Sequence, residues 1–348
     1  MSFFGGGTDY VTWFKEHGGA FLSTTINKYC YVMCRRLPPF FEVSGRISWS
    51  KIENVNALDE IENPVVRECL RFLKFEPNLD IHYHGDLPAR SGLGSSSAFA
   101  VGLLHSLHAL NNEYVTKRVL ATEAIKVEQD LIGDTVGVQD QTAVAYGGLN
   151  HAVIDKEGEV VVRPVIMSPD RMRELESHII LFFTGISRSA AAIASAKVQS
   201  FAKRMQEMKR IRELVDEALD ILHRSRDLSD FGELLHEGWR MKRSLSSVVS
   251  TDFIDDAYAA ARAAGAWGGK LLGAGGGGFL LVFAPPERHP QIMRALDNLL
   301  YVPVEFETQG SQIIFYDPDS YSRISSRPRV NGRGKPELRP ESVTLLQA

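Results

Sequence analysis

The sequence has few of the features that mark secreted, membrane-bound or nucleic-acid-binding proteins. Only three of its 348 residues are cysteine. Cys30, Cys34 and Cys69 lack zinc-type pairing, so reduced thiols are expected rather than a disulfide framework. The formal net charge of −4 leaves no basic footprint for nucleic acid. No basic leader precedes a long apolar run, and no apolar run reaches membrane-spanning length. We therefore expect a cytoplasmic protein that binds neither nucleic acid nor membranes.

Length and patterning predict two domains of mixed α and β structure. In the first half, the patterns favour strands at 24–37, 81–84, 151–154 and 160–166. They also favour one buried helix at 98–110. The charged run after Pro169 is interpreted as a boundary.

The second half begins with a strand over 178–184 and continues with helical patterning over 187–264, broken near 229–230. A strand at 279–283 and a helix to about residue 300 follow, and 302–307 and 312–316 are expected to form a hairpin. We expect domains at 1–175 and 176–318, followed by a polar, poorly ordered tail over 319–348.

The stretch "LPARSGLGSSSAFAVGLLHSLHAL" opens an apolar helix with glycines and three serines. Glycine allows close backbone approach, and the free N–H groups of a helix start favour an anion such as phosphate. The alternative is that Ser95 simply caps a core helix. No lysine follows the last glycine, so this is not a Walker A loop. The third glycine of a dinucleotide fingerprint is also missing.

Glu128 lies at the centre of the apolar stripe of the helix around "ATEAIKVEQDLI". A carboxylate that faces a core needs a partner. A salt bridge with arginine or lysine would satisfy it, and so would a magnesium ion bound to phosphates.

Two further motifs contain glycine, one next to an aspartate and one next to an apolar strand. "GVQDQ" places Asp140 between two glutamines, where it is either part of a turn or a carboxylate that takes a proton from a hydroxyl. "GAGGGG" at 273–278 leads directly into Phe-Leu-Leu-Val-Phe, which favours close approach to a ligand over a flexible linker.

The motif "GGGTDY" at residues 5–10 places Asp9 behind three glycines. Asp9 is either a helix cap or an acceptor for substrate hydroxyls.

These motifs carry a family resemblance. Pro88-x-x-x-Gly-Leu-Gly-Ser-Ser-Ser, Gly-Val-Gln-Asp-Gln and Gly-Ala-Gly-Gly-Gly-Gly, in this order, resemble the three motifs of the GHMP small-molecule kinases. The match extends to about Pro318. Within the superfamily, "SFFGGGTDY", "GGAFLSTTINKYCYV" and "LFFTGISRSA" resemble the D-glycero-D-manno-heptose 7-phosphate kinase group, which makes the 1,7-bisphosphate on the way to nucleotide-activated heptose.

The resemblance implies an α+β, two-domain GHMP kinase fold, with an N-terminal domain like ribosomal protein S5 domain 2 and a ferredoxin-like C-terminal domain. It implies ATP and Mg²⁺ as cofactors, a sugar phosphate as substrate and a possible homodimer. Asp140 matches the catalytic base, and Ser96 and Glu128 match the magnesium ligands. The implied ATP-binding residues are Gly92, Leu93, Gly94, Ser95, Ser96, Ser97, Gly275, Gly276 and Gly277. The implied substrate-binding residues are Gly7, Thr8, Asp9 and Arg188, the last as a contact for the sugar's own phosphate.

The motif "GGGTD" is preceded in the resembling kinases by a strand like Ala-Pro-Leu-Arg-Ile-Ser-Phe. Met1 stands at the isoleucine position here, so we expect that strand and its arginine to be missing from this chain and a natural start upstream.

Two other functions remain open from the sequence. One is a kinase of the same superfamily for another sugar such as fucose or galactose, although the Glu-His of the galactokinase signature is replaced here by Gly6-Gly7. The other is a non-catalytic binding module derived from such a kinase, which would be expected to have lost the base or a metal ligand.

Overall fold

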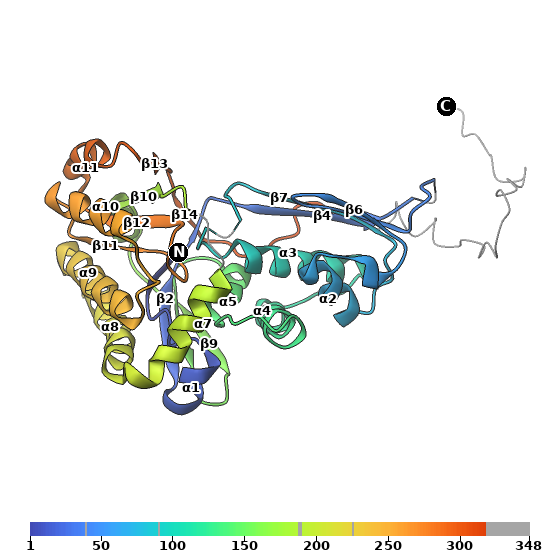
Figure 1. Ribbon diagram of the computed structural model, residues 1–348, viewed down its shortest axis with the longest axis horizontal. Coiled ribbons are helices and arrows are strands. Elements are labelled where there is room, and N and C mark those ends of the chain that lie inside the picture. The colour runs from blue at the N-terminus through green and yellow to red at the C-terminus, as the bar shows by residue number, and fades with distance from the viewer. Residues whose placement is uncertain (39, 90, 187–189, 225, 318–348) are drawn as a thin grey trace, which may run out of the picture.

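The computed structural model describes residues 1–38, 40–89, 91–186, 190–224 and 226–317. The molecule is elongated, with β4, β6 and β7 towards one end and α8–α11 towards the other (Figure 1). None of the helices in the described ranges is long and apolar enough to cross a bilayer.

The first sheet is antiparallel throughout, in the order β1-β2-β8-β9. Its strands are β1 (Ser2–Phe4), β2 (Gly19–Ser23), β8 (Asn150–Ile154) and β9 (Val160–Pro164). The expectation that the strand before "GGGTD" is missing is wrong for residues 2–4, because they pair with β2 as β1.

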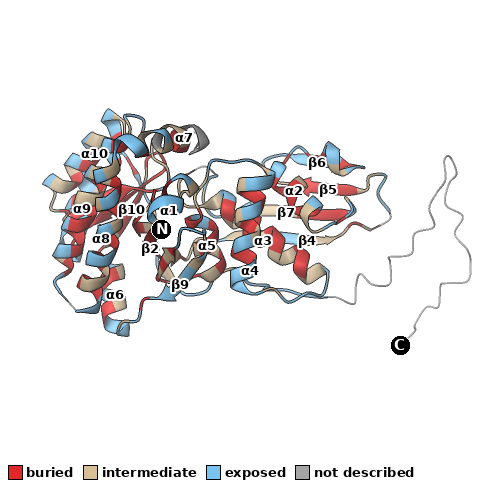
Figure 2. Ribbon diagram, turned by 90° about the horizontal axis from the view of Figure 1, so that it is seen from below, coloured by how far each residue is buried: buried red, intermediate tan, exposed pale blue. Residues whose placement is uncertain are grey.

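The second sheet has the order β4-β7-β5-β6, with β5 and β7 parallel and the other pairs antiparallel. Its strands are β4 (Cys30–Arg36), β5 (Gly45–Ser48), β6 (Ile52–Val55) and β7 (Leu79–Gly85). One face is covered by α2 (Pro64–Phe72), α3 (Ser95–Leu110) and α4 (Lys117–Lys126) (Figures 1 and 2). Apolar residues of the sheet and of these helices form one core, as the alternation in β4 and the apolar α3 require.

The third sheet has the order β11-β12-β10-β13 and is antiparallel. Its strands are β10 (Ile179–Phe183), β11 (Gly268–Leu271), β12 (Phe279–Phe283) and β13 (Leu300–Tyr301). Every residue of β12 is buried, as expected for an apolar run with a neighbour on both sides.

The remaining helices are α1 (Val11–His17), α5 (Gln139–Tyr146), α6 (Pro169–Ser177), α7 (Ala190–Ser200), α8 (Met205–His223), α9 (Leu228–Leu245), α10 (Asp252–Ala263) and α11 (His289–Ala295). Short helical turns also occur at η1 (Leu58–Glu60), η2 (Val127–Leu131), η3 (Phe201–Lys203) and η4 (Pro286–Arg288).

The largest core joins the two halves of the chain. Phe3 and Leu22 from the first sheet pack in one cluster with Leu214 of α8 and Phe279 of the third sheet. A two-stranded ladder pairs β3 (Thr25–Ile26) with β14 (Phe306–Glu307), which returns the end of the described chain to its beginning. The division at residue 175 remains a prediction.

Two expectations about elements are wrong, the unbroken strand over 24–37 and the hairpin of 302–307 with 312–316. The segment 24–37 is broken into β3 and β4, because Lys28 N–H turns back to the Ile26 carbonyl at 2.8 Å. The charged run after Pro169 forms helix α6, capped by the Ser168 hydroxyl, and its interpretation as a boundary stays a prediction. The hairpin of 302–307 and 312–316 does not form, because β14 pairs with β3 and 312–317 contains no strand.

Candidate active site

The glycine–serine loop before α3 has the geometry of an anion site. Gly92 and Gly94 have φ values of +82° and +70°, which glycine adopts without strain. Gly94 occupies the cap position of α3 and no side chain caps the helix there, so the alternative role of Ser95 as a cap is wrong. The three serines form the first turn, where N–H groups lack partners within the helix. Residues 92–97 all line a cavity of about 1730 Å³.

The second glycine segment, 273–278, packs backbone to backbone against this loop. A Cβ on Gly273 would lie 2.4 Å from Cα of Gly92, and a Cβ on Gly278 would lie 2.1 Å from the carbonyl oxygen of Ser91. Any side chain at these two positions would push the segments apart. The segment is therefore a fitted contact and not a linker.

The glycines 275–277 lie behind this contact and do not line the cavity. A Cβ on either end of the triplet would meet backbone of other segments, and the Gly276 N–H donates to the Val249 carbonyl at 2.8 Å. Gly273 and Ala274 line the cavity instead. The geometry gives 275–277 a supporting role for the loop rather than the direct contact with ATP that the resemblance implies.

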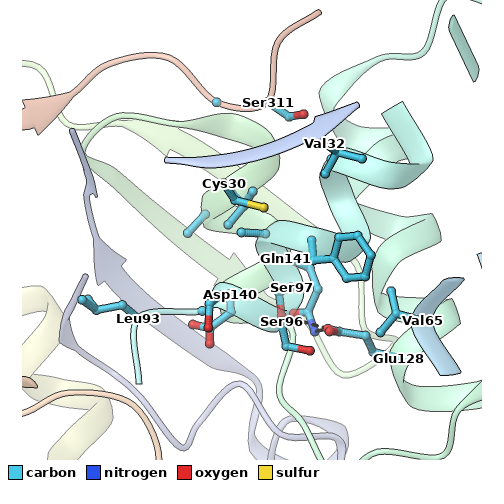
Figure 3. Close-up of a pocket in the computed structure, with 18 of the residues that line it drawn as sticks. Cys30, Val32, Val65, Leu93, Ser96, Ser97, Glu128, Asp140, Gln141 and Ser311 are labelled. Carbon is cyan, nitrogen blue, oxygen red and sulfur yellow. Dashed lines mark hydrogen bonds between the residues drawn. The ribbon is translucent and has the colours of Figure 1, made fainter. Parts of the chain in front are cut away.

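Glu128 lies in η2, the π-helical turn after α4, with only 2% of the residue exposed. Its carboxylate accepts hydrogen bonds from Ser97 Oγ at 2.8 Å and from Gln141 Nε2 (Figure 3). These three side chains come from η2, α3 and α5. Both donors are neutral, so the salt-bridge alternative finds no support among the described residues.

The residues around Glu128 fit a magnesium ion. Burial raises the pKa of Glu128 to about 7, against the opposing effect of the bonds from Ser97 and Gln141, and Asp140 raises it further. Gln141 Oε1 is also buried and has no hydrogen-bond partner. A carboxylate, a hydroxyl and an amide oxygen are hard ligands of the kind Mg²⁺ takes together with phosphate oxygens.

The hydroxyl predicted to lie near magnesium was that of Ser96. The structure places Ser96 at the cavity wall with an exposed side chain, whereas the buried Ser97 makes the bond to Glu128. Across the described residues, no group of three or more His, Cys, Asp or Glu gathers as a metal site. Glu128 is the buried carboxylate of this arrangement, with the Ser97 hydroxyl and the Gln141 amide beside it.

Asp140 lies in the first turn of α5, exposed at the cavity wall. A Cβ on Gly94 would lie 3.3 Å from the Asp140 carboxyl carbon, so this carboxyl group rests against the loop before α3 (Figure 3). An acceptor for a proton is thus placed beside the expected position of the phosphates.

Asp9 joins two of the sequence motifs. Its carboxylate accepts from the Gly7 N–H at 2.8 Å and from the Gln139 N–H at 3.4 Å. A Cβ on Gly137 would lie 1.8 Å from Asp9 Oδ2, so only glycine fits there. Gly7 and Asp9 line the cavity, as a substrate contact requires.

Thr8, by contrast, is fully buried and is not among the residues that line the cavity. Its hydroxyl donates to the carbonyls of Gly5 and Ala20, both at 2.9 Å, and accepts from the Ala20 N–H. The geometry supports a structural role for this side chain rather than the implied substrate contact. Arg188 lies outside the described residues.

Tyr10, Gln141 and Lys242 are among the residues of this cavity that sequence reasoning missed. Burial, with Asp9 and Asp140 nearby, raises the pKa of Tyr10, so its phenol stays protonated. Tyr10 and Gln141 stand beside Asp9 and Asp140 in the quoted motifs, which was the available signal. Lys242 lies on a helix far from any motif, and only the fold brings it here.

Family models match both halves of the chain. The model described as GHMP kinases N terminal domain matches residues 63–148, and the model described as GHMP kinases C terminal matches residues 211–302.

Curated relatives and solved structures agree with these models. The D-glycero-alpha-D-manno-heptose 7-phosphate kinase of Campylobacter jejuni is 30% identical over 303 residues, 84% of this chain and 89% of the relative. The bifunctional fucokinase/GDP-fucose pyrophosphorylase of Arabidopsis thaliana is 30% identical over 214 residues, 59% of this chain but 20% of that much longer protein. The crystal structure of a D-glycero-D-manno-heptose 1-phosphate kinase from Bacteroides thetaiotaomicron aligns with a TM-score of 0.72 and 26% identity, over 89% of this chain and 94% of that one.

Proposed function

This chain belongs to the GHMP kinases and is an ATP-dependent phosphotransferase, and we propose that its acceptor is the anomeric hydroxyl of D-glycero-D-manno-heptose 7-phosphate. The product would be the 1,7-bisphosphate, for nucleotide-activated heptose synthesis. The similarity to the Campylobacter jejuni kinase over most of both chains supports this substrate.

The observation that carries the proposed chemistry is the contact between Asp140 and Gly94. It places a carboxylate at the edge of the loop whose free N–H groups suit phosphate. Asp9 and Gly7 line the same cavity and offer contacts for sugar hydroxyls.

Phosphoryl transfer depends mainly on positioning and on neutralising charge. Residues 92–97 would hold the ATP phosphates with backbone N–H groups, and Asp140 would take the proton of the attacking hydroxyl. Glu128 and Ser97 would hold Mg²⁺ with Gln141 behind them, and Ser96 would face the phosphates. When bound, that ion would neutralise charge on the phosphate oxygens.

A panel of acceptors tests the substrate. ADP release is measured for heptose 7-phosphate, free heptose, fucose, galactose and mevalonate, and ³¹P NMR locates the new phosphate. We expect kcat/KM for heptose 7-phosphate to exceed that of every other acceptor by at least about tenfold, with the new phosphate at C1. A free sugar that is turned over faster, or a phosphate at another carbon, would refute the proposal.

Fucose is the second candidate, because the similarity to the Arabidopsis thaliana protein extends over 59% of this chain. A binding module without turnover is the third; it would bind ATP but release no ADP with any acceptor.

A further inference from the structure

Residues 92–97 contain neither lysine nor arginine, and a lysine from the other half of the chain lines the same cavity. Lys242, on α9, is only 7% exposed and lines the same cavity as residues 92–97. The phosphates of ATP carry several negative charges, which N–H groups and one metal neutralise only in part.

Two hydrogen bonds fix the position of this ammonium group. Lys242 Nζ donates to the Leu271 carbonyl at 2.8 Å and to the Gly273 carbonyl at 2.6 Å. Gly273 is also the residue whose Cα packs on Gly92. The ammonium group therefore links the end of β11 to the turn that follows, and the residue it binds in that turn packs against the loop.

A buried lysine is costly unless its charge finds a partner. Two carbonyl oxygens and the Trp239 ring, 5.8 Å away, supply partial negative charge. A polyphosphate in the adjoining cavity would add negative charge to these contacts. Lys270 also lines the cavity, but its Nζ donates to the Phe3 carbonyl at 2.9 Å, which ties it to β1 rather than to the glycine turn.

We propose that Lys242 is a nucleotide-phosphate-binding residue that supplies a cation from α9 beside residues 92–97, which themselves contain neither lysine nor arginine, and that its bonds to 271 and 273 hold the glycine turn against Gly92. This inference rests on the proposed function, because it takes ATP as the ligand of the cavity.

The test measures nucleotide binding without a sugar acceptor, so that it does not depend on turnover. Dissociation constants of ATP, ADP and AMP are obtained by calorimetry for the full chain and for Lys242→Met. A charge-assisted hydrogen bond to phosphate corresponds to a loss of about tenfold or more. We expect that loss for ATP, a smaller one for ADP and less than about twofold for AMP. The dependence of ATP affinity on salt should also flatten.

Arg243→Met is the matched control. Arg243 is the next residue on α9, but it is exposed and binds Asp255. Its loss should leave all three dissociation constants unchanged.

Lys242→Gln and Lys242→Arg separate charge from a merely structural tether. We expect the arginine variant to keep more ATP affinity and more salt dependence than the glutamine variant. If Lys242→Met does not fold, this comparison tests the inference in its place. Equal losses for ATP and AMP, an unchanged salt slope, or equal behaviour of the two variants would overturn the inference. If the phosphate-dependent loss is found but heptose 7-phosphate is not turned over, the proposed substrate fails and the assignment of Lys242 stands.

Discussion

At the scale of single residues, the carboxylates in the cavity have different environments and therefore different expected roles. Asp140 is exposed beside the loop, Asp9 is held by backbone N–H groups, and Glu128 is buried among neutral donors. Environment rather than residue type separates a proton acceptor from a metal ligand.

The first prediction concerns Asp140. Asp140→Asn should lower kcat by about 10²–10⁴-fold and leave nucleotide affinity nearly unchanged, because it removes only the proton acceptor. Asp134→Asn is the control, since Asp134 is also exposed on the cavity wall but is not among the atoms nearest a Cβ on Gly94. Steady-state kinetics and nucleotide binding measure both effects. Near wild-type kcat in Asp140→Asn would exclude it as the base.

The second prediction concerns Glu128 and pH. The pKa of Glu128 in the folded protein is about 7, above the ordinary value of 4.5. Protonation of Glu128 therefore stabilises the folded protein, fully below about pH 4.5, and this stabilisation is lost as pH rises through 7. The deprotonated form is the one that would bind Mg²⁺. The Mg²⁺ concentration for half activity should therefore fall between about pH 6 and pH 8.

Glu128→Gln should raise that Mg²⁺ concentration and weaken its dependence on pH, while any titration of ATP itself affects both proteins alike. Magnesium titrations at each pH measure this. Identical curves for the two proteins would remove Glu128 from the metal site.

At the scale of elements, a histidine clamp joins α3 to α4. His108 Nδ1 meets Glu113 at 2.9 Å and Nε2 meets Glu123 at 2.7 Å. Burial lowers the pKa of His108, but the hydrogen bonds with Glu123 and Glu113 outweigh this and leave the pKa above its ordinary value. The clamp fixes α3, whose first turn carries the three serines that we propose as phosphate contacts.

The third prediction follows from the sign of that shift. A raised folded pKa stabilises the protein below about pH 6.5, and the stabilisation is lost as pH rises through the folded pKa. His108→Gln should cost roughly 1–3 kcal/mol of unfolding free energy at pH 5.5 and clearly less at pH 9.

Urea denaturation at both pH values measures the difference. His105→Gln, three residues earlier on α3, is the control, because burial lowers the pKa of His105 and its loss should not show this trend. A cost that does not change with pH would refute the charged clamp.

At the scale of the whole molecule, the two halves meet where glycines let backbones touch. Gly278 has a φ of +100° and faces the Ser91 carbonyl across the boundary between the two sequence halves. This contact therefore helps to set the position of the loop at the cavity wall.

The fourth prediction compares two glycines. Gly278→Ala should lower Tm and raise KM for ATP several-fold. Its new methyl group would clash with the Ser91 carbonyl, and alanine would also be strained at the positive φ of this position. Gly133→Ala shares the strain, roughly 1–2 kcal/mol, since Gly133 has a φ of +81°, but nothing lies within 4 Å of its Cβ position. Calorimetry and kinetics measure both variants. Equal effects would mean that the contact with Ser91 contributes nothing.

The sequence by itself determined the fold family and the main motifs, because their chemistry is local. Glycine spacing, the serines at a helix start and a carboxylate in an apolar stripe can all be recognised along the chain, and Glu128 is buried as that pattern predicts. The family expectation is confirmed by models that match both halves.

Only the tertiary structure decided which atoms meet. Ser97 rather than Ser96 reaches Glu128, since adjacent residues on a helix point about 100° apart and local pattern does not say which faces η2. Thr8 faces inward to Gly5 and Ala20, and β14 pairs with β3 instead of forming a hairpin. Lys242 lines the same cavity as residues 92–97 from a helix about 150 residues away in sequence. Contacts of this range depend on how cores pack, and no local spacing encodes them.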